Sequence, residues 1–345
     1  MSLTILSVGY PLAAVSPNSA GGAEQILAAL DRALVAAGHR SIVVAPAGSR
    51  VAGHLHAIAP VPDGIDPAAQ RRAQDETATA IAAVRAREAV DLIHLHGIDF
   101  PAYHPAPGVP VLATLHLPPD WYPAEALRGD SPDTWLHCVS EAQHATCPPS
   151  PRLLPPLPNG VPLERLTARH AKRNFALFLG RICPEKGVHL AIAAARAAGV
   201  PLLIAGQVYP YPDHQRYFDE AVRPALGPGC RFLGPVGFAR KRRLLSAARC
   251  LLVPSLAAET SSLVAREAAA CGTAVIAFPN GAMTETVEHG RTGFIVDDVA
   301  GMAAEIGNAG RIAPEACRAV AAARFSEAVM VDRYLALYSQ LSGRA

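Results

Sequence analysis

The chain has 345 residues, half of them hydrophobic and 17% charged, with a formal net charge of +2. This composition is typical of a globular protein of about two domains, and it lacks the positive charge that a nucleic-acid-binding chain needs. The seven cysteines show no paired spacing, and no apolar run reaches about 18 residues. We therefore expect a cytoplasmic protein with reduced thiols and no secretory leader, and neither nucleic acid nor a membrane as a partner.

The first half of the chain alternates apolar strands with amphipathic helices. Strands are expected at 3–10, 40–46, 91–97, 110–116 and 136–140, and helices at 23–39 and 67–89. Apolar strands separated by helices predict a parallel sheet that is covered on both faces.

A proline-rich segment then interrupts this pattern, with seven prolines between Pro148 and Pro162. Beyond it the alternation restarts, with strands expected at 175–181, 200–206, 230–236, 250–255, 273–278 and 294–298, and helices at 188–199, within 211–226 and at 240–248. The prediction is an α/β chain of two doubly wound Rossmann-like domains facing a central cleft, residues 1–165 and 166–325. A final helix within 326–345 is expected to cross back to the first domain, with five apolar residues near one face: Val329, Tyr334, Leu337, Tyr338 and Leu341.

Two acidic residues eight positions apart, Glu259 and Glu267, are the most informative pair in the chain. Glu259 follows a short apolar strand, and Glu267 is expected inside a helix with Ser261 or Ser262 as N-cap and Gly272 just after its end. The free N–H groups at the start of that helix are suited to phosphate.

Five short motifs, in this order, make the chain resemble a family of enzymes. They are GGAE at Gly21–Glu24, NGVP at Asn159–Pro162, FLGRICPEKG at Phe178–Gly187, the Glu259/Glu267 pair, and GRTGFIV at Gly290–Val296. With these motifs the chain resembles the retaining glycosyltransferases of the GT-B fold, family 4, also called group 1. The resemblance implies transfer of a sugar from a nucleoside-diphosphate sugar to the hydroxyl of a small-molecule or glycan acceptor.

The resemblance also implies roles for individual residues. Arg181 and Lys186 would grip the donor diphosphate, Glu267 would accept hydrogen bonds from the nucleotide ribose, and Glu259 would contact sugar hydroxyls. The donor would also be bound by loop residues, namely Gly21, Gly22, Thr260, Ser261, Ser262 and Leu263. His116, at the end of an expected strand, resembles a histidine that faces the donor sugar and is counted with Glu259, Arg181 and Lys186 as catalytic.

Other patterns limit this interpretation. No Asp-x-Asp triplet occurs, so we expect no metal requirement and no cofactor. His94 and His96 share one face of a strand and are expected to line the core or the cleft, and the basic run at 240–243 is expected to be a solvated helix face. Two alternatives stay open: a sugar-nucleotide epimerase on the same fold, and a catalytically inactive nucleotide-sugar-binding protein.

Overall fold

The computed structural model describes residues 2–129 and 131–343. The chain divides into two compact units, the first comprising residues 1–159 and 328–345 and the second residues 160–327. The division falls a few residues before the boundary expected from the prolines. No helix in the described residues is long and apolar enough to cross a lipid bilayer.

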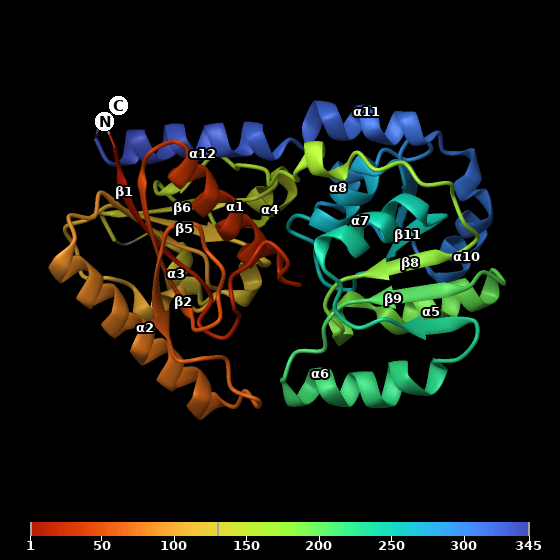
Figure 1. Cartoon of the computed structure of the whole chain (residues 1–345), viewed down its shortest axis with the longest axis horizontal. Coiled ribbons are helices and arrows are strands. Elements are labelled where there is room, and N and C mark those ends of the chain that lie inside the picture. Colours follow the sequence, from red (N-terminus) through yellow and green to blue (C-terminus); the bar gives the residue numbers. More distant parts are fainter. Residues whose placement is uncertain (1, 130, 344–345) are drawn as a thin grey trace. The chain divides into compact units, whose positions relative to one another are not determined.

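The first unit is built on a seven-stranded sheet (Figure 1). Its strands are β1 (Thr4–Val8), β2 (Arg40–Pro46), β3 (His54–Ile58), β4 (Leu92–Leu95), β5 (Val111–Leu115), β6 (Thr134–Cys138) and β7 (Leu153–Leu154). Its α-helices are α1 (Gly22–Ala36), α2 (Pro67–Arg87), α3 (Ala124–Leu127), α4 (Glu141–Thr146) and, apart from its first residue, α12 (Glu327–Leu341). The strand order is β3-β2-β1-β4-β5-β6-β7, and all pairs are parallel.

The second unit repeats this design with six strands. They are β8 (Ala176–Leu179), β9 (Leu202–Ala205), β10 (Cys230–Phe232), β11 (Cys250–Val253), β12 (Ala274–Ala277) and β13 (Gly293–Ile295). Its α-helices are α5 (Val188–Ala197), α6 (Pro212–Tyr217), α7 (Phe238–Ala247), α8 (Leu263–Ala270), α9 (Met283–Thr286), α10 (Val299–Asn308) and α11 (Pro314–Arg324). All pairs are parallel, and the strand order is β10-β9-β8-β11-β12-β13. From β8 the chain first adds strands on one side, and it then returns to add β11 and the later strands on the other side.

The two sheets confirm the predicted fold class. In each unit the chain winds outward from a central strand, first to one side and then to the other, which is the doubly wound arrangement. Every residue of β4, β5, β8, β11 and β12 is buried, which explains why these strands are almost entirely apolar, with His94 and Thr114 as the exceptions. Ligands of such sheets bind beyond the carboxyl ends of the strands where the order reverses. In the second unit this position lies beyond β8 and β11.

Helix α12 is held to the first sheet by its aromatic side chains. Tyr334 and Tyr338 are fully buried, as expected, and Met330 is buried beside them. Val329 was expected on the same face, but it is 50% exposed. The buried positions recur every four residues, and this spacing places Met330 rather than Val329 on the buried stripe.

A continuous chain of hydrogen bonds joins α12 to three strands. The Nδ1 atom of His137 lies 3.0 Å from the Cys138 carbonyl, which only accepts, so Nδ1 carries the proton and Nε2 accepts. The Thr114 hydroxyl donates to that Nε2 at 2.7 Å and accepts from His94 Nε2 at 2.6 Å. His94 Nδ1 then accepts from the Tyr338 hydroxyl at 2.8 Å. With both histidines neutral, every link of this chain has one donor and one acceptor.

Burial sets the charge state of this cluster. It lowers the pKa of His137 to about 4 and holds the pKa values of His94 and His96 well below the usual range, with the neighbouring histidines adding to the effect for the latter two. In the unfolded chain each of these histidines takes up a proton near pH 6.5. The folded unit therefore binds fewer protons than the unfolded chain below that pH.

We expect the free energy of unfolding to fall as the pH is lowered from 6.5 towards 4. Each histidine that stays neutral in the folded state contributes a loss of up to about 1.4 kcal/mol per pH unit. Urea unfolding at pH 7, 6 and 5 measures this slope. His137→Gln should make it shallower and His54→Gln, at an exposed position, should not. A stability that is constant from pH 7 to 5 would contradict this interpretation.

Candidate active site

Two loops at the switch point of the second sheet carry most of the predicted site residues. One loop follows β8 and contains Arg181 and Lys186, and the other follows β11 and contains Glu259. The Leu256 N–H donates to the Glu185 carbonyl across them at 2.8 Å. Gly187 permits the close approach, because it adopts a positive φ of 64° and a Cβ there would lie 2.1 Å from the Pro254 carbonyl oxygen.

An ion pair between a half-buried lysine and a buried glutamate joins the two loops. Lys186 Nζ lies 2.6 Å from Glu259 Oε1, and the same oxygen accepts a short hydrogen bond from the Ser255 hydroxyl. Glu259 is only 9% exposed. Burial alone would raise the pKa of its carboxyl, but the Lys186 charge, the two hydrogen bonds and the Arg181 charge outweigh it and lower the pKa. Glu259 is therefore a carboxylate at neutral pH, and it already holds a cation.

A third loop supports Glu259 from behind. The Ala282 N–H donates to the Glu259 carbonyl at 2.7 Å, and the Asn280 side chain donates to the Ser255 carbonyl at 2.6 Å. Gly281 has a φ of 61°, and a Cβ there would lie 2.3 Å from the Glu259 carbonyl oxygen. Ser255 and Gly281 were not among the predicted site residues, since neither belongs to the quoted motifs.

Arg181 is engaged on the β8 loop itself. Its guanidinium lies 3.4 Å from the Glu185 carboxylate, with both side chains about one quarter exposed. Burial would raise the pKa of Glu185, but hydrogen bonds from its own backbone and from the Cys183 thiol, together with the Arg181 charge, lower it. Burial raises the pKa of the Cys183 thiol to about 12.

Helix α8 begins at Leu263, four residues after Glu259, with its N-cap at one of the two predicted serines. Ser262 occupies the N-cap position without making a side-chain cap, and Gly272, with a φ of 72°, follows the end of the helix. The first backbone N–H groups of α8 therefore have no acceptor within the helix. Ser261 adds a buried hydroxyl with no hydrogen-bond partner among the described residues, whereas Thr260 is half-buried.

The second acid, Glu267, is also paired with a lysine. Its Oε1 lies 2.5 Å from Lys241 Nζ, and its Oε2 is buried with no partner in the described part of the chain. The basic run at 240–243 was expected to be a solvated face, and for Lys241 this is wrong, because it is only 8% exposed. Lys241 precedes the buried Leu245 by one helical turn, so it lies on the apolar face of α7. Arg240 and Arg243 are exposed, as expected.

The first unit holds the remaining predicted residues. Gly21 is the N-cap of α1, and a Cβ there would lie 1.8 Å from Glu24 Oε2, so the buried Glu24 side chain fills the space beside it. Gly22 is the first residue of α1. His116 directly follows β5 and is half-buried, and its Nε2 lies 3.0 Å from Nδ1 of the core residue His96. Burial, with a smaller effect from His137, lowers the pKa of His116 to about 3, so its imidazole is neutral at ordinary pH.

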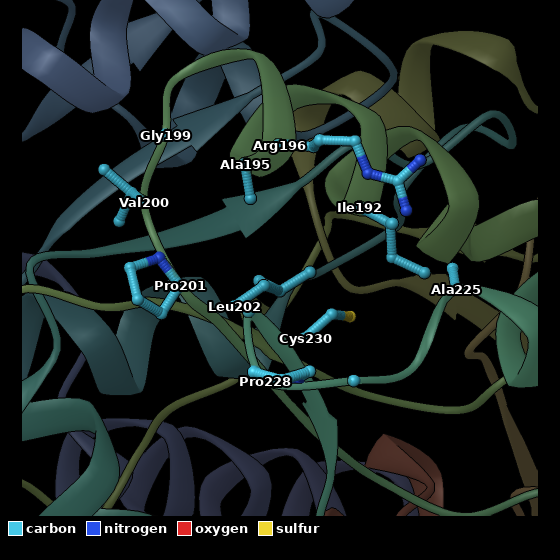
Figure 2. Close-up of a pocket in the computed structure, with 12 residues that line it drawn as sticks. Ile192, Ala195, Arg196, Gly199, Val200, Pro201, Leu202, Ala225, Pro228 and Cys230 are labelled. Carbon is cyan, nitrogen blue, oxygen red and sulfur yellow. The ribbon is translucent and has the colours of Figure 1, made fainter.

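A pocket elsewhere in the second unit does not include these residues. Figure 2 shows it between the end of α5, the segment Val200–Leu202 and the segment Ala225–Cys230. Leu202 and Cys230 are the first residues of β9 and β10. The pocket therefore lies at the amino ends of the strands, opposite the edge where the switch-point rule places a ligand.

Comparisons with known proteins agree with the fold. Residues 20–165 match the family model described as Glycosyltransferase Family 4, and residues 173–309 match that described as Glycosyl transferases group 1. The architecture is thus that of a GT-B glycosyltransferase. The chain belongs to the family 4, or group 1, glycosyltransferases.

Individual relatives cover different parts of the chain. A D-inositol 3-phosphate glycosyltransferase of Mycolicibacterium smegmatis is 38% identical over 47% of this chain but only 39% of its own length. AviGT4, a glycosyltransferase involved in avilamycin A biosynthesis, aligns over 99% of both chains with 25% identity and a TM-score of 0.72. Anabaena HepE, solved with UDP and glucose, aligns over 98% of this chain and 100% of its own, with 19% identity and a TM-score of 0.75.

We expect Lys241→Met to lower the free energy of unfolding by about 3–5 kcal/mol, because it leaves the buried Glu267 carboxylate without its cation. The double variant Lys241→Met/Glu267→Gln carries no charge at the site and should recover more than half of that loss. Arg240→Met, at the exposed neighbouring position, should change stability by less than about 0.5 kcal/mol. Urea unfolding of the parent, these three variants and the single variant Glu267→Gln measures the coupling, and additive losses would contradict a direct ion pair.

Proposed function

We propose that the chain transfers a sugar from a nucleoside-diphosphate sugar to an acceptor hydroxyl, with retention of configuration at the anomeric carbon and without a divalent metal. The observation that carries the proposal is the arrangement beyond β8 and β11. There two carboxylates, each paired with a lysine, flank the N-terminus of α8. Family membership and the likeness to HepE, which was solved with UDP and glucose, support a nucleotide-sugar donor.

In this proposal the diphosphate is held by cations and amides. Arg181 offers two N–H groups to phosphate oxygens, Lys186 adds a point charge, and the first N–H groups of α8 complete the site. These groups stabilise the negative charge that develops on the leaving diphosphate as the glycosidic bond breaks. A metal is then not needed for that task.

The two acids take different parts of the donor. The buried Oε2 of Glu267 has no partner among the described residues. We propose that it accepts a hydrogen bond from a hydroxyl of the nucleotide ribose. Glu259 is assigned to hydroxyls of the transferred sugar, where its charge favours an oxocarbenium-like transition state. The acceptor attacks from the face that the diphosphate leaves, and a phosphate oxygen takes its proton. His116, neutral at ordinary pH, is assigned a hydrogen bond to the sugar.

Incubation of the protein with nucleoside-diphosphate sugars and candidate acceptors tests the reaction. We expect nucleoside diphosphate to be released at an appreciable rate only when an acceptor is present. The product should keep the anomeric configuration of the donor. At saturating donor, a chelator should leave turnover nearly unchanged. Isomerised donor sugar without transfer indicates an epimerase, and binding without any reaction indicates an inactive binding protein. Loss of turnover in chelator that a divalent ion restores would exclude the metal-free mechanism.

Substitutions of Glu259 and Glu267 should have different effects on nucleotide affinity, measured by calorimetry, and on the rate of transfer. Glu267→Gln should weaken binding of the bare nucleoside diphosphate by about 1.5–3 kcal/mol, the value of one hydrogen bond to a charged group. Glu259→Gln should leave that affinity unchanged or tighter, because Lys186 is released towards the phosphates, yet it should cut transfer strongly. Equal losses of diphosphate affinity in both variants, or full transfer by Glu259→Gln, would show that this division of roles is wrong.

A further inference from the structure

Three potential metal ligands lie together beside the candidate diphosphate site. Cys183 and Glu185 come from the β8 loop and His214 from α6, and one ligand atom from each lies within 4.8 Å of the others. Cys183 is fully buried, and the other two are half-buried. The Nδ1 atom of His214 is buried and has no hydrogen-bond partner among the described residues, which is costly unless a further group satisfies it.

The chemical types of these three ligands indicate which metal they would bind. A thiolate, an imidazole and a carboxylate are ligands that Zn²⁺ binds together, and three protein ligands leave a fourth position for water. At zinc–ligand lengths of about 2.0–2.3 Å, tetrahedral ligand atoms lie roughly 3.3–3.7 Å apart. The ligand atoms, which lie within 4.8 Å of one another, therefore need to approach by no more than about 1.5 Å. Rotation of the partly exposed Glu185 and His214 side chains can supply this movement.

We propose that Cys183, Glu185 and His214 form a zinc site that tunes the neighbouring diphosphate loop. Without metal, the thiol and imidazole are neutral and the carboxylate gives the cluster a charge of −1. With Zn²⁺ bound, the thiol releases its proton, and the charges of +2, −1 and −1 sum to zero. The same carboxylate lies 3.4 Å from Arg181, so its use as a ligand weakens its attraction for that guanidinium.

Both changes favour an anion at the candidate site. The local charge becomes more positive by one unit, and the Glu185 carboxylate competes less with phosphate oxygens for Arg181. Zinc at this position would thus tighten nucleoside diphosphate binding without taking part in the reaction. This last consequence rests on the proposed function, whereas the zinc site itself does not.

Metal titration of the whole chain tests the site. We expect one Zn²⁺ per chain, and with Co²⁺ as the probe a near-ultraviolet charge-transfer band from a cobalt–thiolate bond. Cys183→Ser should abolish the band, and His214→Gln should weaken metal affinity at least about tenfold, since losing even an outer-shell partner costs that much. Cys230→Ser and His170→Gln, outside the cluster, should behave as the parent. Circular dichroism of each variant checks that it is folded.

The outcomes are separable. An absence of stoichiometric zinc binding, or a cobalt–thiolate band that persists in folded Cys183→Ser, would overturn the proposed site. If zinc binds as described, nucleoside diphosphate affinity should rise severalfold in the parent and stay constant in Cys183→Ser. Zinc binding with no change in that affinity would overturn the coupling and leave the site itself standing. Failure of the chain to bind any nucleoside diphosphate would count against the proposed function instead.

Discussion

The Glu259 carboxylate can be buried in the second unit because the ammonium group of Lys186 forms an ion pair with it. The contact between its carboxylate and Lys186 joins the loop after β8 to the loop after β11, which are neighbours only because the strand order reverses between them. A buried carboxylate without a cation costs several kcal/mol, so either loop out of place would leave a charge uncompensated. The backbone hydrogen bond between Leu256 and Glu185 stabilises this approach and Gly187 permits it, whereas Gly281 lets the third loop approach the Glu259 backbone.

The same solution recurs at the other end of the site. The chain has three lysines, and two of them, Lys186 and Lys241, neutralise the two acids eight residues apart. The carboxylates therefore do not dominate the local field, and Arg181 and the N-terminus of α8 leave the strand ends attractive to an anion. The third lysine, Lys172, donates a hydrogen bond to the Thr273 hydroxyl, and burial lowers the pKa of Lys172 to about 8.

The sequence was sufficient for the features that depend on local order. Strand and helix periodicity predicted two parallel sheets but missed β3 and β7 of the first sheet. The N-cap of α8 was predicted to be Ser261 or Ser262 and is Ser262, and Gly272 follows the helix as predicted. Contacts between distant segments were out of reach. Nothing in the motifs pairs Tyr338 with His94, or His214 with Cys183, because the tertiary fold alone brings them together. Lys241 was missed for a different reason: a run of four basic residues suggests solvent, although its spacing from Leu245 placed it on the apolar face.

The proposed role of the residues beyond β8 and β11 requires that a nucleoside diphosphate binds there. Calorimetric titration of a panel of nucleoside diphosphates, on the parent chain and on Arg181→Gln, measures it. At least one nucleotide should bind with a stoichiometry of one. Arg181→Gln should weaken that binding by about 1.5–3 kcal/mol, roughly 10- to 150-fold, since it removes a charge-assisted contact to phosphate. No binding across the panel, or equal affinity in Arg181→Gln, would contradict the account.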